Sequence, residues 1–194
     1  MHGPLVVDTC RHARRGVTML EIAVTLMVAG VFASIAVVKF DAGKYKADAA
    51  ATYVQTSLQQ AERLAVQRQY NVIVSVDLAN ARLRLIEDAN EDGRASVGER
   101  VTWRPLGDGM RFDVPPATVG GAPAAAVVGS HIKLLDGMPT ITMRRDGAAT
   151  SDLELYVKSP RNRATDFRAV VMTQSTGRAD VLKWTGSSWM GGLY

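Results

Sequence analysis

Apolar and polar residues divide the chain into three parts, and the first is the most apolar. Residues 17–38 form a run of twenty-two residues in which Glu21 is the only charged side chain. A helix rises about 1.5 Å per residue, so this run measures about 33 Å, enough to cross the roughly 30 Å hydrocarbon core of a bilayer. The pattern therefore predicts a transmembrane helix over residues 17–39.

The second part, residues 40–70, has the pattern of an amphipathic helix that continues the first. It is rich in alanine and contains no proline, and apolar residues recur at helical spacing: Val54, Leu58, Ala61 and Ala65. The predicted polar face carries Gln55, Gln59, Glu62, Arg63 and Arg68. We expect the apolar stripe to pack on a β-sheet.

The third part, residues 71–194, consists of short β-type runs separated by turn signals such as Asp-Gly and Thr-Gly. The predicted strands cover residues 72–76, 82–86, 100–103, 110–114, 131–135, 140–144, 153–158, 167–173 and 179–184. Residues 115–129 are rich in Pro, Gly and Ala and predict a mobile loop. The predicted fold class is α+β, with one long N-terminal helix packed on antiparallel β-sheet.

The composition of the chain reduces the number of functions that it can have. The 47% hydrophobic content and the net charge of only +4 exclude intrinsic disorder. The single cysteine, Cys10, excludes an internal disulfide framework and multi-cysteine metal centres. The chain contains no Gly-x-Ser-x-Gly elbow, phosphate-binding loop or His-Glu-x-x-His motif, and His131 is expected to be structural. We therefore predict that the protein is not an enzyme and requires no cofactor.

The N-terminal segment is basic, with Arg11, Arg14 and Arg15 before the apolar run. That run is too long for the apolar region of a secretory signal peptide, and no small-x-small cleavage site follows it. The arginines favour a cytoplasmic N-terminus. A carboxylate costs about 2.5–3.5 kcal/mol at the bilayer centre and little at headgroup depth, so the position of Glu21 alone leaves its role open.

The residues around Glu21 resemble a known signal. Arg15-Gly16-Val17-Thr18-Met19-Leu20-Glu21, followed directly by apolar residues, is similar to the class III signal of type IV pilins and type II secretion pseudopilins. The resemblance implies that a prepilin peptidase cuts between Gly16 and Val17, removes the leader (residues 1–16) and methylates the new amine. The first mature residue in that family is most often Phe, and here it is Val17. The resemblance also implies that Glu21 pairs with the N-terminal amine of a neighbouring subunit.

Two motifs in the last third resemble the GspH/FimT group of minor pseudopilins and minor pilins. Residues 141–147 read as a strand entering a turn, and residues 167–178 end in Ser175-Thr176-Gly177-Arg178. The resemblance implies a pilin-like fold and a minor pseudopilin of a type II secretion system, assembled near the tip of the periplasmic pseudopilus.

The same resemblance implies partners and a location. The partners would be other pilins or pseudopilins, the prepilin peptidase, the inner-membrane assembly platform and membrane lipid. The protein would be a single-pass protein of the inner membrane, with a cytoplasmic N-terminus and a periplasmic globular domain (residues 71–194). The alternative is a minor pilin of a type IV pilus, including a DNA-binding pilin that serves DNA uptake.

Residues 88–99 match the calcium-loop template D-x-[DN]-x-[DN]-G-x5-E at every specified position. Oxygen ligands would come from Asp88, Asn90, Asp92, Ser96 and Glu99. The flanking residues predict strands and not the paired helices of an EF-hand. The alternative, an acidic hairpin loop that binds no metal, stays open.

DNA binding is the second candidate chemistry. Some pilins of the FimT type bind DNA through a Gly-Arg-x-Arg motif, which corresponds here to Gly177-Arg178-Ala179-Asp180. Arg178 is the candidate contact, with Arg161, Arg163, Arg168 and Lys183 as other basic residues nearby in the sequence. An acid replaces the second arginine and opposes phosphate binding. A solvated surface of mixed charge is the alternative.

Overall fold

Two helices occupy the part of the chain where helix is predicted. The computed structural model describes residues 17–40, 42–161 and 163–191. Helix α1 covers Met19–Phe40 and helix α2 covers Ala42–Arg68. The chain divides into two compact units between residues 40 and 41, so each helix is described by itself. The predicted leader and the continuity of the two helices lie outside the described residues.

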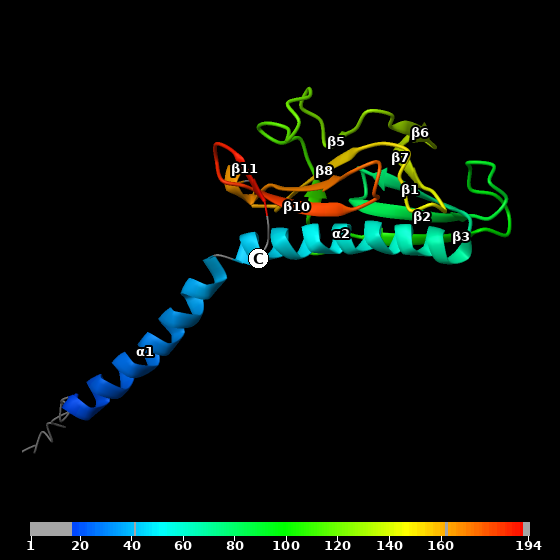
Figure 1. Ribbon diagram of the computed structural model, residues 1–194. Helices are drawn as coiled ribbons and strands as arrows, with labels where there is room; N and C mark the ends of the chain where they lie inside the picture. Colours follow the sequence, from blue (N-terminus) through cyan, green and yellow to red (C-terminus); the bar gives the residue numbers. More distant parts are fainter. Residues whose placement is uncertain (1–16, 41, 162, 192–194) are drawn as a thin grey trace, which may run out of the picture. The chain divides into compact units, whose positions relative to one another are not determined.

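Two antiparallel sheets follow α2 (Figure 1). The first sheet has the order β3-β2-β1-β7-β6 and consists of β1 (Asn71–Asp77), β2 (Arg82–Asp88), β3 (Arg100–Pro105), β6 (Lys133–Leu135) and β7 (Met138–Met143). The second has the order β11-β10-β9-β8-β4, with β5 also paired to β8. It consists of β4 (Arg111–Phe112), β5 (Val127–Val128), β8 (Leu153–Lys158), β9 (Arg168–Met172), β10 (Ala179–Trp184) and β11 (Trp189–Gly191). A short 3-10 helix, η1 (Ala164–Asp166), precedes β9. The predicted α+β class is confirmed.

All nine predicted strands are present, and the differences lie at their ends. The predicted strand at 131–135 begins only at Lys133, so His131 lies in an exposed turn and not in a strand. The structure adds β5 and β11, of two and three residues. Strands this short have no periodicity of their own, and only pairing with β8 and β10 defines them.

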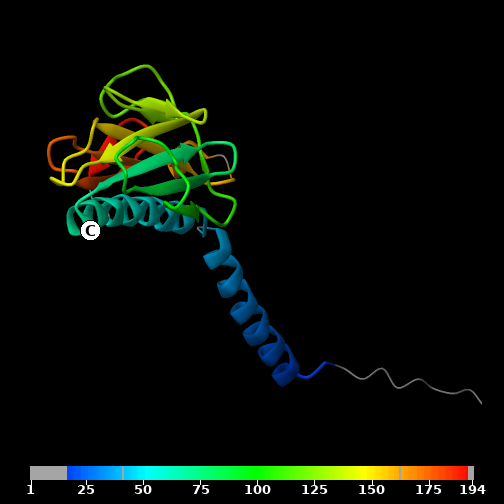
Figure 2. The same ribbon diagram turned by 90° about the vertical axis from the view of Figure 1, so that its right-hand side faces the viewer.

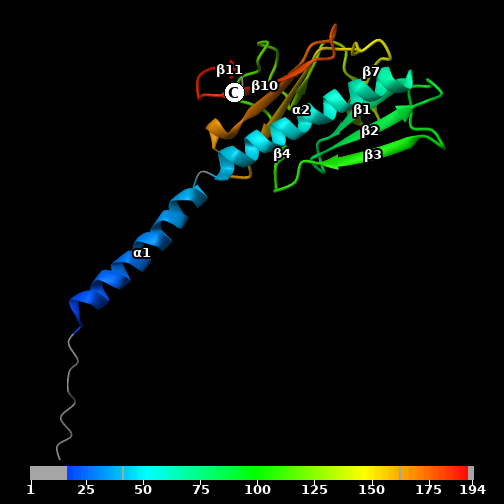
Figure 3. The same cartoon turned by 60° about the horizontal axis from the view of Figure 1, so that its bottom comes forward.

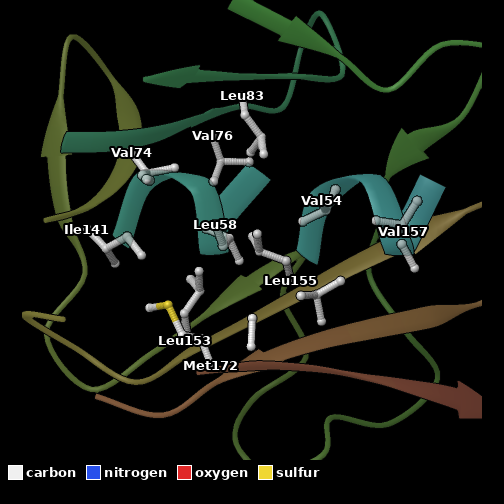
Figure 4. Close-up of a cluster of buried hydrophobic side chains, with 14 of the residues drawn as sticks. Val54, Leu58, Val74, Val76, Leu83, Ile141, Leu153, Leu155, Val157 and Met172 are labelled. Atoms are coloured by element: carbon white, nitrogen blue, oxygen red, sulfur yellow. The ribbon is translucent and has the colours of Figure 1, made fainter. Parts of the chain in front are cut away.

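The core lies between α2 and both sheets, which Figures 1 and 2 show on the same side of the helix. The helix contacts β1, β2 and β7 of the first sheet and β8, β9 and β10 of the second. The predicted apolar stripe is confirmed, because its four residues are fully buried. Figure 4 shows Val54 and Leu58 among side chains from both sheets. Each such fully buried Val or Leu stabilises the fold by about 1.5–3 kcal/mol.

The predicted polar face of α2 is partly wrong. Arg63 and Arg68 are exposed as expected, but Gln55 is half-buried and donates a hydrogen bond from Nε2 to the carbonyl oxygen of Ala179 in β10, at 2.8 Å. Gln59 and Glu62 are half-buried as well. Strands of the two sheets lie on both sides of α2 in Figure 3, with β10 on one side and β1, β2 and β3 on the other. Polar residues beside the apolar stripe therefore become part of the packed interface.

An ion pair between a fully buried arginine and a half-buried aspartate joins α2 to the second sheet. Arg168 of β9 is fully buried, its Nε donates to Asp48 Oδ1 of α2, and its Nη1 donates to the carbonyl oxygens of Thr165 and Phe167. The sequence placed Arg168 among the basic residues open to DNA, and the structure corrects this. Every second residue of β9 points toward α2, so Arg168 shares the inner face with Val170 and Met172.

The predicted mobile loop at residues 115–129 is fastened to the second sheet, on the side away from α2 (Figure 1). Val119 N donates to Tyr156 Oη and Trp189 Nε1 donates to the carbonyl oxygen of Ala117, both at 2.8 Å. Gly120 N donates to Glu154 Oε1 at 3.0 Å. The Pro, Gly and Ala content of residues 115–129 does not predict these contacts, because the hydrogen-bond partners lie in β8 and β11.

Asp77, at the end of β1, gives the fold a pH dependence. Hydrogen bonds from Asn80, through its side chain first and also its backbone N–H, together with Arg82, lower the pKa of the buried Asp77 carboxyl to about 2. An unfolded Asp has a pKa of about 3.9, so this stabilisation of about 2 kcal/mol is complete above that pH and is lost as the pH falls toward 2. We expect the stability difference between the parent and Asp77→Asn to shrink over that range in urea unfolding series. A difference independent of pH would contradict the assignment.

Candidate functional sites

The first candidate site is the start of α1. Thr18 caps the helix, since the Glu21 backbone N–H donates to Thr18 Oγ1 at 3.2 Å and to the Thr18 carbonyl oxygen at 3.0 Å. Sequence reasoning missed this cap, although Thr-x-x-Glu before an apolar run is a recognised signal for it. Val17 is exposed immediately before the cap, and Gly16 lies outside the described residues.

The Glu21 carboxylate projects from the first turn of α1. Its side chain is exposed and has no hydrogen-bond or ion-pair partner among the described residues. The N-terminal end of a helix carries partial positive charge, which favours a carboxylate there by about 0.3–1 kcal/mol. This stabilises the helix but leaves both carboxylate oxygens available to another molecule.

From Ile22 to Ala33, α1 is apolar on all sides apart from Thr25. Every described side chain from residue 17 to residue 33 is exposed, including Met19 at 90%, Leu26 at 67% and Phe32 at 69%. A helix that is apolar all round is normally buried by its surroundings. Within the described part of the chain, neither helix combines the length and apolarity required to cross a membrane.

The second candidate site is the connection from β2 to β3, here named the acidic loop (residues 88–99). It begins at Asp88, which is almost fully buried at the end of β2. Asp88 Oδ1 and Oδ2 accept hydrogen bonds from the backbone N–H groups of Asp92 and Gly93, both at 3.1 Å. Gly93 has a φ of +73°, so a glycine suits this turn. These two hydrogen bonds thus fix the Asp88 side chain against the backbone of the loop.

The structure brings three predicted metal ligands together. One carboxylate oxygen each from Asp88, Asp92 and Glu99 lie within 4.8 Å of one another. Ser96 and Asn90 touch this group through Asp92 Oδ2, which accepts from Ser96 Oγ and, at 3.0 Å, from Asn90 Nδ2. All five predicted residues therefore lie in one cluster.

The surroundings of Asp88 disfavour its charged form. Burial raises its pKa most, and the neighbouring charges of Glu99 and Asp92 raise it further, against the hydrogen bonds from the backbone. At Asp92, by contrast, the hydrogen bond from Ser96 lowers the pKa. Among the described residues, no Lys or Arg side chain forms a salt bridge with any of the three carboxylates.

Arg178, the candidate DNA contact, is exposed, and its guanidinium group forms an ion pair. Its Nη2 lies 3.1 Å from Asp180 Oδ1, so the acid that replaces the second arginine of the motif offsets the charge of the first. The preceding glycine has a packing role: a Cβ atom on Gly177 would lie 2.4 Å from the carbonyl oxygen of Gly147 in the neighbouring turn. Close approach of two turns accounts for this glycine without a ligand.

No family model and no curated protein matches the chain. Two solved structures of the minor pseudopilin EpsH from the type II secretion system of Vibrio cholerae are similar, each at 13% sequence identity over 71% of this chain. The matches span 97% and 94% of the two EpsH chains, with TM-scores of 0.47 and 0.46. EpsH belongs to the class of protein that the sequence motifs resemble. At this identity and TM-score, its role does not transfer to this chain.

Proposed function

We propose that the chain is a minor pseudopilin of a type II protein secretion system, which assembles with other subunits near the tip of the periplasmic pseudopilus. In this proposal its role is assembly and not catalysis. The first helix packs in the filament, Glu21 sets the position of the helix, and the surface of the sheets selects the partner subunits.

The observation that carries the proposal is the Glu21 carboxylate in the first turn of an apolar helix, which has no partner among the described residues. In water, the exposed apolar side chains of α1 are unfavourable, at about 25 cal/mol per Å² of apolar surface. Packing against the helices of other subunits removes this surface from water, and a positively charged amine on a neighbour would satisfy Glu21. Cleavage of a pilin-type leader would produce such an amine at the first mature residue of each subunit, which is Val17 in this chain.

The proposal includes a location. Before assembly, residues 17–39 would anchor the chain in the inner membrane, with the N-terminus in the cytoplasm and residues 71–194 in the periplasm. The basic residues Arg11, Arg14 and Arg15 support this orientation. The exposed apolar side chains of α1 support burial of this helix in lipid or among other helices.

The test is the secreted proteome of an in-frame deletion strain, compared with its parent and with the strain carrying the intact gene. We expect exoproteins to disappear from the medium and to return with the gene. A secretome that does not change would contradict the proposal. It would favour a minor pilin of a type IV pilus, and loss of pili or of DNA uptake in the same strain would then identify that role.

A further inference from the structure

We propose that the acidic loop binds one calcium ion, with ligands from Asp88, Asp92 and Glu99 and additional oxygens from Asn90 and Ser96. This inference is independent of the proposed role in secretion. It concerns residues of the second compact unit only.

The geometry suits a calcium ion. Calcium binds oxygens at about 2.3–2.6 Å, so two ligands of one ion lie at most about 5 Å apart. The ligand oxygens of Asp88, Asp92 and Glu99 lie within 4.8 Å of one another. They come from the two ends and the middle of the loop, and the antiparallel register of β2 and β3 brings the ends together. An ion at the centre would contact all three with small shifts of side chains.

An independent observation points to a ligand in this cluster. The Glu99 residue is half-buried, but its Oε1 is shielded from solvent and has no hydrogen-bond partner among the described residues, whereas Oε2 accepts from the Ser96 backbone N–H at 2.8 Å. A buried carboxylate oxygen without a partner is costly, and native proteins rarely leave one unsatisfied. The loop does contain a further carboxylate, Glu91, but Arg145 neutralises it at 3.1 Å. Glu91 thus has a salt-bridge partner, whereas the three carboxylates of the cluster have none among the described residues.

The chemistry of the ligand set selects among metals. Every candidate ligand is an oxygen, and the acidic loop contains neither histidine nor cysteine, which disfavours zinc and copper. Magnesium requires near-ideal octahedral geometry at about 2.0–2.1 Å, whereas calcium accepts six to eight oxygens in flexible arrangements. An irregular loop that offers carboxylate, amide and hydroxyl oxygens suits calcium. Bidentate contact by Glu99 would satisfy its buried oxygen.

The test is equilibrium dialysis of the full chain in detergent against radioactive calcium, after removal of bound metal with a chelator. We expect saturation at one ion per chain. Glu99→Gln keeps the shape of the side chain and removes its charge, and should weaken binding by at least about tenfold. Glu91→Gln is the matched control, because it removes the same charge from the same loop outside the ligand set. Its affinity should stay within about twofold of the parent.

Absence of saturable binding to the parent up to millimolar calcium would overturn the proposal, as would a Glu99→Gln variant that binds as tightly as the parent. If Glu99→Gln does not fold, as judged by circular dichroism, Asp92→Asn decides instead, because the Asp92 side chain is exposed and outside the core. Asp92→Asn with parental affinity would overturn the proposal. Complete displacement of calcium by an equal concentration of magnesium would also count against it.

Discussion

Replacing Glu21 by alanine is expected to abolish co-purification of the chain with other pilin-like subunits, while the chain is still produced and its leader is still removed. A carboxylate and an amine about 4 Å apart attract each other by about 4 kcal/mol at an effective dielectric constant of about 20, and by about 1 kcal/mol in water. A loss of about 4 kcal/mol corresponds to roughly a thousandfold weaker association. The measurement is recovery of partner subunits with the tagged chain from detergent-solubilised membranes.

Two further variants separate the charge of Glu21 from its size and polarity. Glu21→Gln keeps the shape and should fail like the alanine variant, because the amide cannot pair as a charge. Thr25→Val, one turn further along α1, removes a hydroxyl that donates to the Ile22 carbonyl oxygen at 2.9 Å and should leave co-purification unchanged. Recovery of partners at the parental level with Glu21→Gln would show that the charge does not direct assembly.

Replacing Asp48 by alanine is expected to destabilise the second unit by about 3–5 kcal/mol. The substitution leaves the guanidinium of Arg168 fully buried without its counter-charge, and an unpaired buried charge is among the most destabilising changes in a protein. Two backbone carbonyls remain as acceptors for Arg168 but do not neutralise it. Urea unfolding of a chain that begins at Asp41, followed by circular dichroism, measures the loss.

The control is an exposed pair on the same sheet. Asp180→Ala removes the partner of Arg178, and because both side chains are solvated the loss should be only about 0–1 kcal/mol. The double variant Asp48→Ala with Arg168→Met should recover most of the stability, since an apolar side chain can replace the buried charge. Equal losses for Asp48→Ala and Asp180→Ala would mean that the buried pair does not hold α2 on the second sheet.

Local pattern predicted most of the elements. The spacing of Val54, Leu58, Ala61 and Ala65 identified the buried side of α2, because helical periodicity places them on one face whatever they pack against. The alternation and turn residues after residue 70 located nine strands. The pattern could not reveal that two sheets share one helix, and therefore it assigned Gln55 to solvent.

The sequence by itself determined the elements of the second unit, the lone carboxylate in an apolar helix, and the spacing of oxygen side chains in the acidic loop. These are local properties, since they depend on residues a few positions apart. Only the tertiary structure decided that Arg168 is buried against Asp48, that residues 115–129 are fastened to the second sheet, and that Glu99 has a buried oxygen without a partner. Each depends on residues far apart in sequence or on burial, and the order of residues along a strand or loop does not encode which distant group will cover it.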